Sequence, residues 1–372
     1  MIIKAFKVYF LLAAFAFSSI LSCSESSDAR CNIGGSISGN NDEFLYLKKI
    51  QDRQMITIDS TRVFESQFHF APLLLQSPEM LYVQIGNRKS LIQVFAENSD
   101  ITMEIPADKI EKTLISGSSV HAEYADFLEN NEAYNNKLED VYKRTLTARK
   151  NQNANLEKDL DSLKRLLLRE QKSFLYRYAL ENDDSYTALY ITSESLSQHT
   201  DYAILRKILD NFSLKLSVSP YYKRIKEKLE LKASLAAGAE APDLSFLKLE
   251  KRQDCDYLWL IFPYPEKEYI LQASEAVYEN RQILESLNME AFAVLPESIN
   301  ETYSELYTEY TDIEFVFRAD SEYESLKKIY DLNYALKNFI VGKDSVILKS
   351  AMHISQIEDY IEYLNGKSNR VP

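Results

Sequence analysis

The first part of the chain, from residue 32 to about residue 106, alternates apolar and polar positions in short runs. Residues 81–85 (LYVQI) and 91–95 (LIQVF) alternate most regularly. Clusters of Asp, Asn, Gly and Pro separate the runs, as they do between strands, and Pro106 ends the last of them. Short strands at this spacing predict an antiparallel β-sandwich or barrel over residues 32–106.

A helical period replaces this alternation in the next part, which we assign to residues 107–235. From about residue 120, apolar and tyrosine side chains recur every three or four positions, and charged residues fill the opposite face. The Asn-rich residues 151–155 (NQNAN) interrupt the pattern and predict the turn of a helical hairpin. A cap at residues 183–185 and a proline at Pro220 predict the starts of further helices.

Strand-like and helix-like segments alternate after Gly238. Residues 257–262 (YLWLIF) are an unbroken apolar run, which is typical of a strand buried on both faces. Residues 342–345 (GKDS) separate two apolar runs and predict a hairpin. Further strands are expected at residues 289–295 and 315–317, and helices at 266–287, 298–310, 322–330 and 355–364. This order predicts an α/β domain over residues 236–366, so the whole chain is expected to be a multidomain α+β protein.

The N-terminus has the pattern of a secretion signal, which we assign to residues 1–22. Lys4 and Lys7 precede an apolar stretch of 13 residues, which is too short to cross a bilayer comfortably. Residues 20–23 (ILSC) resemble the lipobox of bacterial lipoproteins. The resemblance implies cleavage before Cys23, lipidation of its thiol and a flexible tether over residues 23–31. The alternative is an ordinary cleaved signal that leaves Cys23 as a free thiol.

The composition is that of a folded protein with an acidic surface. The chain has 372 residues and a net charge of −13, and removing Lys4 and Lys7 with the signal would give −15. A negative surface repels phosphate backbones, so we exclude nucleic acid as a partner. Only eight glycines are present, and the chain lacks Gly-rich phosphate-binding motifs. The four histidines lie far apart in the sequence, so neither a metal site nor another cofactor is expected.

Several short motifs carry a resemblance to thioredoxin-like proteins. Residues 238–243 (GAEAPD) resemble the "G-x-x-A-P-D" start of peroxiredoxin-like and thiol-disulfide-oxidoreductase-like domains, and residues 257–262 resemble their first central strand. Residues 330–332 (YDL) and 338–341 (NFIV) resemble the segment before their last hairpin. The resemblance implies a C-terminal thioredoxin-like α/β fold. The alternative is a generic α/β domain in which Ala-Pro-Asp occurs by chance.

The order of the domains carries the same resemblance. Bacteroidetes lipoproteins often combine a β-domain of unknown function, a helical insert and a thioredoxin-like domain. Residues 35–39 (GSISG) resemble the first strand and turn of that β-domain. The resemblance therefore covers nearly all of the chain after the signal.

The residues that thioredoxin-type chemistry requires are missing from the matching positions. Such enzymes use a thiolate at a helix N-terminus and a second Cys in a Cys-x-x-Cys motif. The resemblance places these two positions at Lys267 and Ile270, and it places the proline that faces the disulfide at Leu336. We therefore expect a degenerate site with no catalytic residue. The neighbouring Pro263, Tyr264 and Pro265 form either a loop that ends the strand or a stiffened groove that binds a peptide.

Two cysteines remain beyond the lipobox. Cys255 lies between Asp254 and Asp256, whose charges disfavour a thiolate. An incidental thiol is therefore favoured over a nucleophile. A disulfide between Cys255 and Cys31 is compatible with an oxidising compartment, but the sequence does not test its geometry.

These observations lead to one expected function and two alternatives. We expect an envelope lipoprotein, anchored to a membrane through Cys23, that binds a protein or peptide through a redox-inactive thioredoxin-like domain. The first alternative is a divergent thiol-disulfide or peroxide oxidoreductase that uses Cys255 with the thiol of a partner. The second is a surface lipoprotein that binds glycans or peptides through an exposed cluster of Tyr124, Tyr134 and Tyr142.

Overall fold

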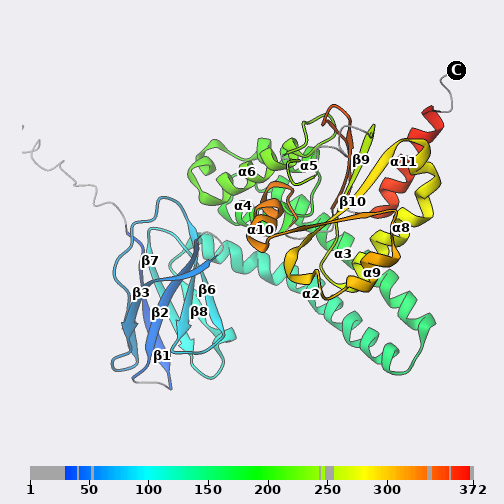
Figure 1. Ribbon diagram of the computed structural model, residues 1–372. Coiled ribbons are helices and arrows are strands. Elements are labelled where there is room, and N and C mark those ends of the chain that lie inside the picture. Colours follow the sequence, from blue (N-terminus) through cyan, green and yellow to red (C-terminus); the bar gives the residue numbers. More distant parts are fainter. Residues whose placement is uncertain are drawn as a thin grey trace, which may run out of the picture. The chain divides into compact units, whose positions relative to one another are not determined.

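The computed structural model describes residues 30–39, 42–51, 54–242, 244–247, 255–332, 337–351 and 353–368. The chain divides into two compact units. The first comprises Met1–Thr192 and Phe212–Lys223, and the second comprises Ser193–Asn211 and Arg224–Pro372. Figure 1 labels the helices and strands of both units.

The first unit begins with a β-sandwich of two four-stranded sheets, ordered β4-β1-β7-β8 and β3-β2-β5-β6. The strands are β1 (Asn32–Ser38), β2 (Phe44–Gln51), β3 (Gln54–Arg62), β4 (Gln67–His69), β5 (Glu79–Ile85), β6 (Leu91–Ala96), β7 (Asp100–Pro106) and β8 (Leu114–Ser116). In β7 the residues that point inward, such as Ile101 and Met103, are buried, while their neighbours are exposed. Apolar and polar residues alternate along the strands because one face of each sheet covers the core and the other faces solvent.

The sandwich matches the expected fold class but differs from the expectation in three details. Strand β1 pairs with β7 in parallel, so the sheets are not purely antiparallel. Strand β8 pairs with β7 although it lies beyond Pro106, where the last strand was expected to end. Cys31, at the end of the predicted tether, is fully buried in the core of the sandwich and pairs with Leu73.

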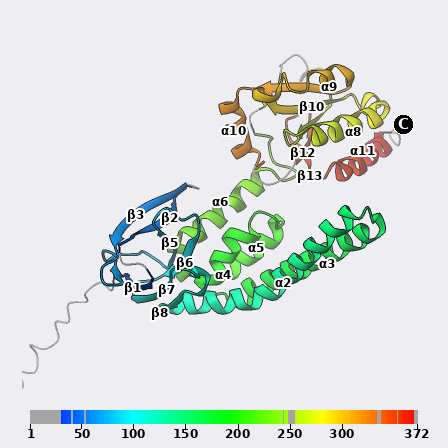
Figure 2. The ribbon, with the colours of Figure 1, turned by 90° about the horizontal axis from the view of Figure 1, so that it is seen from below.

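Two long helices, α2 (Ser119–Lys150) and α3 (Ala154–Glu181), form the predicted hairpin and lie side by side (Figure 2). A side chain caps the N-terminus of each helix: Ser118 accepts a hydrogen bond from His121 N–H, and Asn153 accepts one from Leu156 N–H. Ser185 caps the short α4 (Tyr186–Ile191) in the same way. Shorter segments are the 3₁₀ turns η1 (Ile110–Lys112) and η3 (Leu214–Val218) and the π-helical η2 (Thr192–Leu196).

The second unit is built on one five-stranded sheet with the order β11-β10-β9-β12-β13. The strands are β9 (Tyr257–Phe262), β10 (Met289–Pro296), β11 (Glu314–Arg318), β12 (Lys337–Gly342) and β13 (Ile347–Ala351). Strands β9, β10 and β11 are parallel, whereas β12 is antiparallel to both of its neighbours. The helices and turns are α5 (Tyr202–Asn211), α6 (Pro220–Ser234), α8 (Lys267–Ser286), η4 (Glu297–Ile299), α9 (Ser304–Glu309), α10 (Asp320–Ile329) and α11 (Ile354–Ser368). Helix α6 begins in the first unit, to which residues 220–223 belong, and continues into the second.

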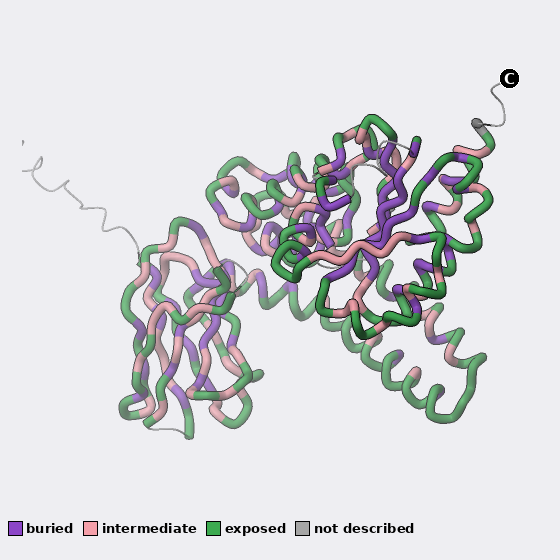
Figure 3. The backbone as a smooth tube through the Cα atoms, viewed as in Figure 1, coloured by how far each residue is buried: buried purple, intermediate pink, exposed green. Residues whose placement is uncertain are grey.

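Helices cover both faces of this sheet. Residues of α8 and α11 pack with Trp259 and Ile340 on one face, whereas residues of α10 pack with Leu260 and Phe339 on the other. Strands β9, β10 and β12 are therefore almost entirely buried, as Figure 3 shows. The connections β9-α8-β10 and α10-β12-β13-α11 give the C-terminal domain a thioredoxin-like α/β fold, as expected.

One predicted helix of this domain is wrong in extent. Residues 298–310 were expected to be continuous, but the structure has η4 followed by α9, with turns between them. The intervening Asn300 and Thr302 are residue types that favour local side-chain hydrogen bonds over a continuous helix. Asn300, for example, donates to the Glu297 carboxylate.

Candidate functional site

The strand-to-helix connection after β9 is the place to which the sequence assigns a degenerate thiol site. Pro263 is buried, while Tyr264 and Pro265 are half-buried, and α8 begins at Lys267. Lys267 is exposed, whereas Ile270 is fully buried beside Leu295 and Leu306. One mapped position is thus a solvated ammonium group, and the other is a core side chain.

Carboxylates surround the N-terminus of α8. Glu266 is the N-cap residue, although its side chain makes no capping hydrogen bond, and Glu268 lies in the first turn. A negative charge at this end interacts favourably with the helix dipole, as a thiolate would. In this protein, glutamate side chains occupy the place where the helix dipole would stabilise a thiolate. Beside them, Tyr264 packs against Tyr269 with ring centroids 5.1 Å apart.

Two further sites predicted from the sequence, Leu336 and the lipidation site Cys23, lie outside the described residues. The described residue next to Leu336 is Lys337, which pairs with Phe262 in the antiparallel register of β12 and β9. Lys337 therefore lies across from the last residue of β9, immediately before the Pro263–Pro265 loop.

An aromatic cluster joins the motifs that carry the family resemblance. The Tyr330 ring lies 4.8 Å from that of Phe262 and 5.3 Å from that of Phe339, measured between centroids. The Tyr330 hydroxyl donates a hydrogen bond to the main-chain oxygen of Pro242. The Ala-Pro-Asp and Tyr-Asp-Leu motifs are thus in direct contact, although 88 residues separate Pro242 and Tyr330.

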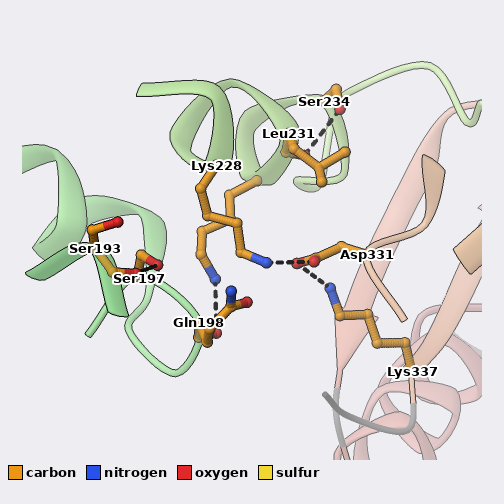
Figure 4. Close-up of polar contacts among 9 residues, drawn as sticks. Ser193, Ser197, Gln198, Lys228, Leu231, Ser234, Asp331 and Lys337 are labelled. Atoms are coloured by element: carbon orange, nitrogen blue, oxygen red, sulfur yellow. Dashed lines mark hydrogen bonds and ion pairs between the residues drawn. The ribbon is translucent and has the colours of Figure 1, made fainter. Parts of the chain in front are cut away.

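Asp331, the next residue, is the centre of a buried ion cluster (Figure 4). Its side chain is 5% exposed. Lys228 of α6 binds one carboxylate oxygen, and Lys337 Nζ lies 2.8 Å from the other. Burial by itself raises the pKa of the Asp331 carboxyl, but the charges of Lys337 and Lys228 and their hydrogen bonds outweigh it, so the pKa lies below its ordinary value.

A third lysine adjoins this cluster. Lys232 follows Lys228 by one turn of α6, and its ammonium group donates to the main-chain oxygen of Gln198 over 3.3 Å. Burial, together with the positive charge of Lys228, lowers the pKa of Lys232 to about 8. Its proton is therefore held less tightly than that of an exposed lysine.

The two described cysteines, Cys31 and Cys255, are buried and are not joined in a disulfide. Cys255 is 2% exposed and precedes β9, whereas α8 begins after the other end of that strand. Cys31 lies in the sandwich, where burial and the charge of Glu97 raise the pKa of its thiol to about 11. The Cys255 thiol therefore does not lie at the N-terminus of α8.

The tyrosines of the helical region do not form one exposed cluster. Tyr124 is buried and packs edge-on against Phe95. Tyr134 is half-buried and stacks on Phe174, and Tyr142 alone is largely exposed. The alternative of a glycan- or peptide-binding tyrosine patch therefore loses the feature on which it depended.

The ion cluster is the feature of this region that the sequence interpretation missed. A weak signal was present, because Asp331 stands between the buried apolar neighbours Tyr330 and Leu332, and Lys337 begins an apolar strand. A charged residue within such a run implies a buried partner. The identity of the partner on α6, more than 100 residues earlier in the chain, follows only from the fold.

Neither a metal-binding cluster nor a membrane-spanning helix occurs among the described residues. Within the ranges given above, no His, Cys, Asp and Glu side chains form a group of three or more that could hold a metal ion. No helix in the described part of the chain has both the length and the apolarity needed to cross a bilayer.

Comparisons with known proteins give one family match and several solved structures. Residues 31–124 match the family described as "Domain of unknown function (DUF4369)". A thioredoxin-like protein from Bacteroides caccae is 16% identical, with 55% of this chain and 84% of that one covered and a TM-score of 0.35. The thioredoxin domain of a thiol-disulfide oxidoreductase from Bacteroides vulgatus is 14% identical, with 34% of this chain and 99% of that one covered and a TM-score of 0.29.

A thioredoxin-like protein from Parabacteroides distasonis is 17% identical, with 34% of this chain and 96% of that one covered and a TM-score of 0.28. No curated protein matches the chain. Nothing about the chemistry of this chain follows from similarities at these levels. The presence of a thioredoxin-like domain rests on the strand order and connections of β9 to α11.

Proposed function

We propose that this protein is an envelope lipoprotein whose thioredoxin-like domain binds a protein or peptide segment without thiol chemistry. Cys23 carries the lipid that anchors the chain to a membrane, with the outer membrane as the preferred location. The lipobox-like residues 20–23 and the preceding signal pattern support this part of the proposal.

The placement of the thiols is the observation that carries the non-catalytic assignment. Thioredoxin-type exchange needs a thiolate that is exposed at a helix N-terminus. The residues at that place are Glu266, Lys267 and Glu268. Cys255 is buried beyond the opposite end of β9, and a strand of six residues is about 20 Å long. A partner disulfide held at the start of α8 would not reach Cys255.

The Pro263–Pro265 loop supports a binding role. The two prolines restrict its backbone, so little conformational entropy is lost when a partner docks there. Tyr264 and the exposed Tyr269 lie in ring contact beside it. Tyrosine is enriched in protein interfaces, since its ring offers apolar area and its hydroxyl a hydrogen bond.

An insulin-reduction assay with dithiothreitol tests the absence of thiol chemistry. The purified chain is expected to give no acceleration over the background, and Cys255→Ala is expected to behave identically, with an active thioredoxin as the positive control. Turnover that Cys255→Ala abolishes would refute the proposal and favour the oxidoreductase alternative. Alkylation supplies a second measurement, because buried Cys31 and Cys255 should react with iodoacetamide only after denaturation.

The anchor is tested separately. Membrane fractionation and mass spectrometry of the N-terminal peptide should find diacylated Cys23 in the membrane pellet, and Cys23→Ala should move the protein to the soluble fraction. An unmodified Cys23 thiol on the mature chain would contradict lipidation without affecting the binding proposal.

A further inference from the structure

Two ammonium groups in the second unit contact a single carboxylate, and a third interacts with the same carboxylate electrostatically without contacting it. Lys228 and Lys232 come from α6, and Lys337 comes from β12. The charges of Lys228 and Lys337 act on both Lys232 and Asp331. The other charged group that acts on Lys232 is Asp201. Asp331 balances only one of the three positive charges, and it is already shared between Lys228 and Lys337.

The excess of positive charge among these three lysines destabilises the folded chain. Like charges four residues apart on a helix repel each other, and here Lys228 and Lys232 are also partly withdrawn from water. Each ammonium group offers three N–H donors. Within the described ranges, each of the three lysines has one polar partner, so donor capacity remains at every one of them.

A buried acceptor lies beside the same lysines. The side-chain oxygen Oε1 of Gln198 is buried and has no hydrogen-bond partner among the described residues. The ammonium group of Lys232 donates to the main-chain oxygen of the same residue, and Figure 4 draws this contact at Gln198 as a dashed line. Cationic donors next to an unfilled acceptor are complementary to a carboxylate that stands close to an amide N–H, which is the combination that a peptide offers.

We propose that Lys232, assisted by Lys228, binds a carboxylate of a peptide partner, and that Gln198 Oε1 accepts a hydrogen bond from an adjacent peptide N–H. The inference rests on the proposed binding function and names the chemistry of its partner. Asp331 provides the intramolecular precedent, since its carboxylate already bridges two of the three ammonium groups. The register of β12 against β9 places Lys337 opposite Phe262, next to the Pro263–Pro265 loop.

Calorimetric titration of the full chain with short peptides tests this site. The probes are acetyl-Gly-Gly-Gly with a free C-terminal carboxylate, acetyl-Gly-Asp-Gly-amide with a side-chain carboxylate, and neutral acetyl-Gly-Asn-Gly-amide, each at about pH 7 and constant ionic strength. At least one carboxylate peptide is expected to bind about tenfold more tightly than the neutral one, which corresponds to about 1.4 kcal/mol. The two carboxylate probes show whether a chain end or an acidic side chain is preferred.

Substitutions on α6 assign the binding to Lys232. Lys232→Met should remove the preference for the carboxylate, Lys232→Arg should retain most of it, and Lys226→Met, at an exposed position of the same helix, should leave it unchanged. Circular dichroism confirms that each variant is folded. Equal binding of charged and neutral peptides, an unaltered preference in folded Lys232→Met, or tighter binding of inorganic phosphate than of either carboxylate peptide would overturn the inference. Thiol turnover in the insulin assay would instead refute the proposed function and leave these titrations interpretable.

Discussion

Lys337 Nζ lies 2.8 Å from the Oδ2 atom of Asp331, and both side chains are largely withdrawn from water. Lys228 holds the other carboxylate oxygen from α6, so three separate elements of the second unit meet at one buried anion. Asp331 adopts a left-handed backbone conformation with φ of +56°. Aspartate is among the non-glycine residues that adopt this conformation most readily, so the turn after α10 accommodates the ion cluster.

Replacing this carboxylate should destabilise the second unit strongly. Asp331→Asn keeps the size of the side chain but leaves two partly buried ammonium groups without their counter-charge, and breaking a buried ion pair costs about 3–5 kcal/mol. Urea unfolding followed by fluorescence measures the loss, since Trp259 is the single tryptophan of the chain and is fully buried in this unit. Asp359→Asn, on the exposed side of α11, is the matched control and should change stability by about 0.5 kcal/mol or less. A similar small effect of both substitutions would contradict a stabilising role for the cluster.

Lys232 should make stability depend on pH above neutrality. Its folded pKa of about 8 lies below the ordinary 10.5, so between these values the unfolded state binds more protons. Stability therefore rises with pH in this window, and the protonated lysine costs the folded state about 1–3 kcal/mol at lower pH. Lys232→Met should be more stable than the wild type at about pH 7 and should lose the slope.

Unfolding in urea between about pH 7 and pH 9 measures this difference, since this range ends about one pH unit below the ordinary tyrosine pKa of about 10. Lys226→Met, on the same helix but well exposed, should follow the wild-type curve. Parallel pH profiles for the wild type and Lys232→Met would show that Lys232 is solvated in the folded chain.

Much of the fold could be predicted from the sequence, because local patterns determine it. Alternation in strands, caps such as Ser118 and Asn153, and the unbroken apolar run of β9 each act over a few residues. The parallel pairing of β1 with β7 could not be predicted, since a strand pattern does not specify the direction of a distant partner. The same holds for β8, whose three residues carry little periodicity.

The candidate site, too, could be predicted from the sequence only where local patterns determine it. The start of the helix after β9 could be predicted, and α8 begins at Lys267, whereas the role of Lys267 and Ile270 as degenerate thiol positions stays a prediction. The partners of Asp331 could not be assigned, because Lys228 looks like any surface lysine of an amphipathic helix until α6 is placed beside β12. Charged residues reveal a buried role only through their three-dimensional neighbours.

In the first unit, the hydroxyl of Tyr221 should contribute to stability through one hydrogen bond. The buried N–H of Met80 in β5 donates to this hydroxyl over 2.7 Å. Tyr221→Phe keeps the ring contacts with Phe95 and Tyr190 but leaves the N–H unsatisfied, which costs about 1–3 kcal/mol. Urea unfolding monitored by far-UV circular dichroism should show the loss, and Tyr222→Phe, at the next position of the same helix, should not. Equal stability of the two variants would mean that water replaces the hydroxyl.

Gly35 should be one of the least replaceable glycines of the β-sandwich. Its φ of +150° is rare for other residues, and a Cβ atom would lie 1.9 Å from the main-chain oxygen of Met103 in the paired strand β7. Neither backbone can move without breaking the parallel β1–β7 ladder, so Gly35→Ala should cost about 4 kcal/mol or prevent the sandwich from folding. Gly39→Ala is the matched control, because its φ is also positive but no atom lies within 4 Å of the added Cβ, and it should cost only about 1 kcal/mol. Hydrogen exchange at the amides of β1 and β7 distinguishes the outcomes, and equal protection in both variants would show that the ladder tolerates a side chain at residue 35.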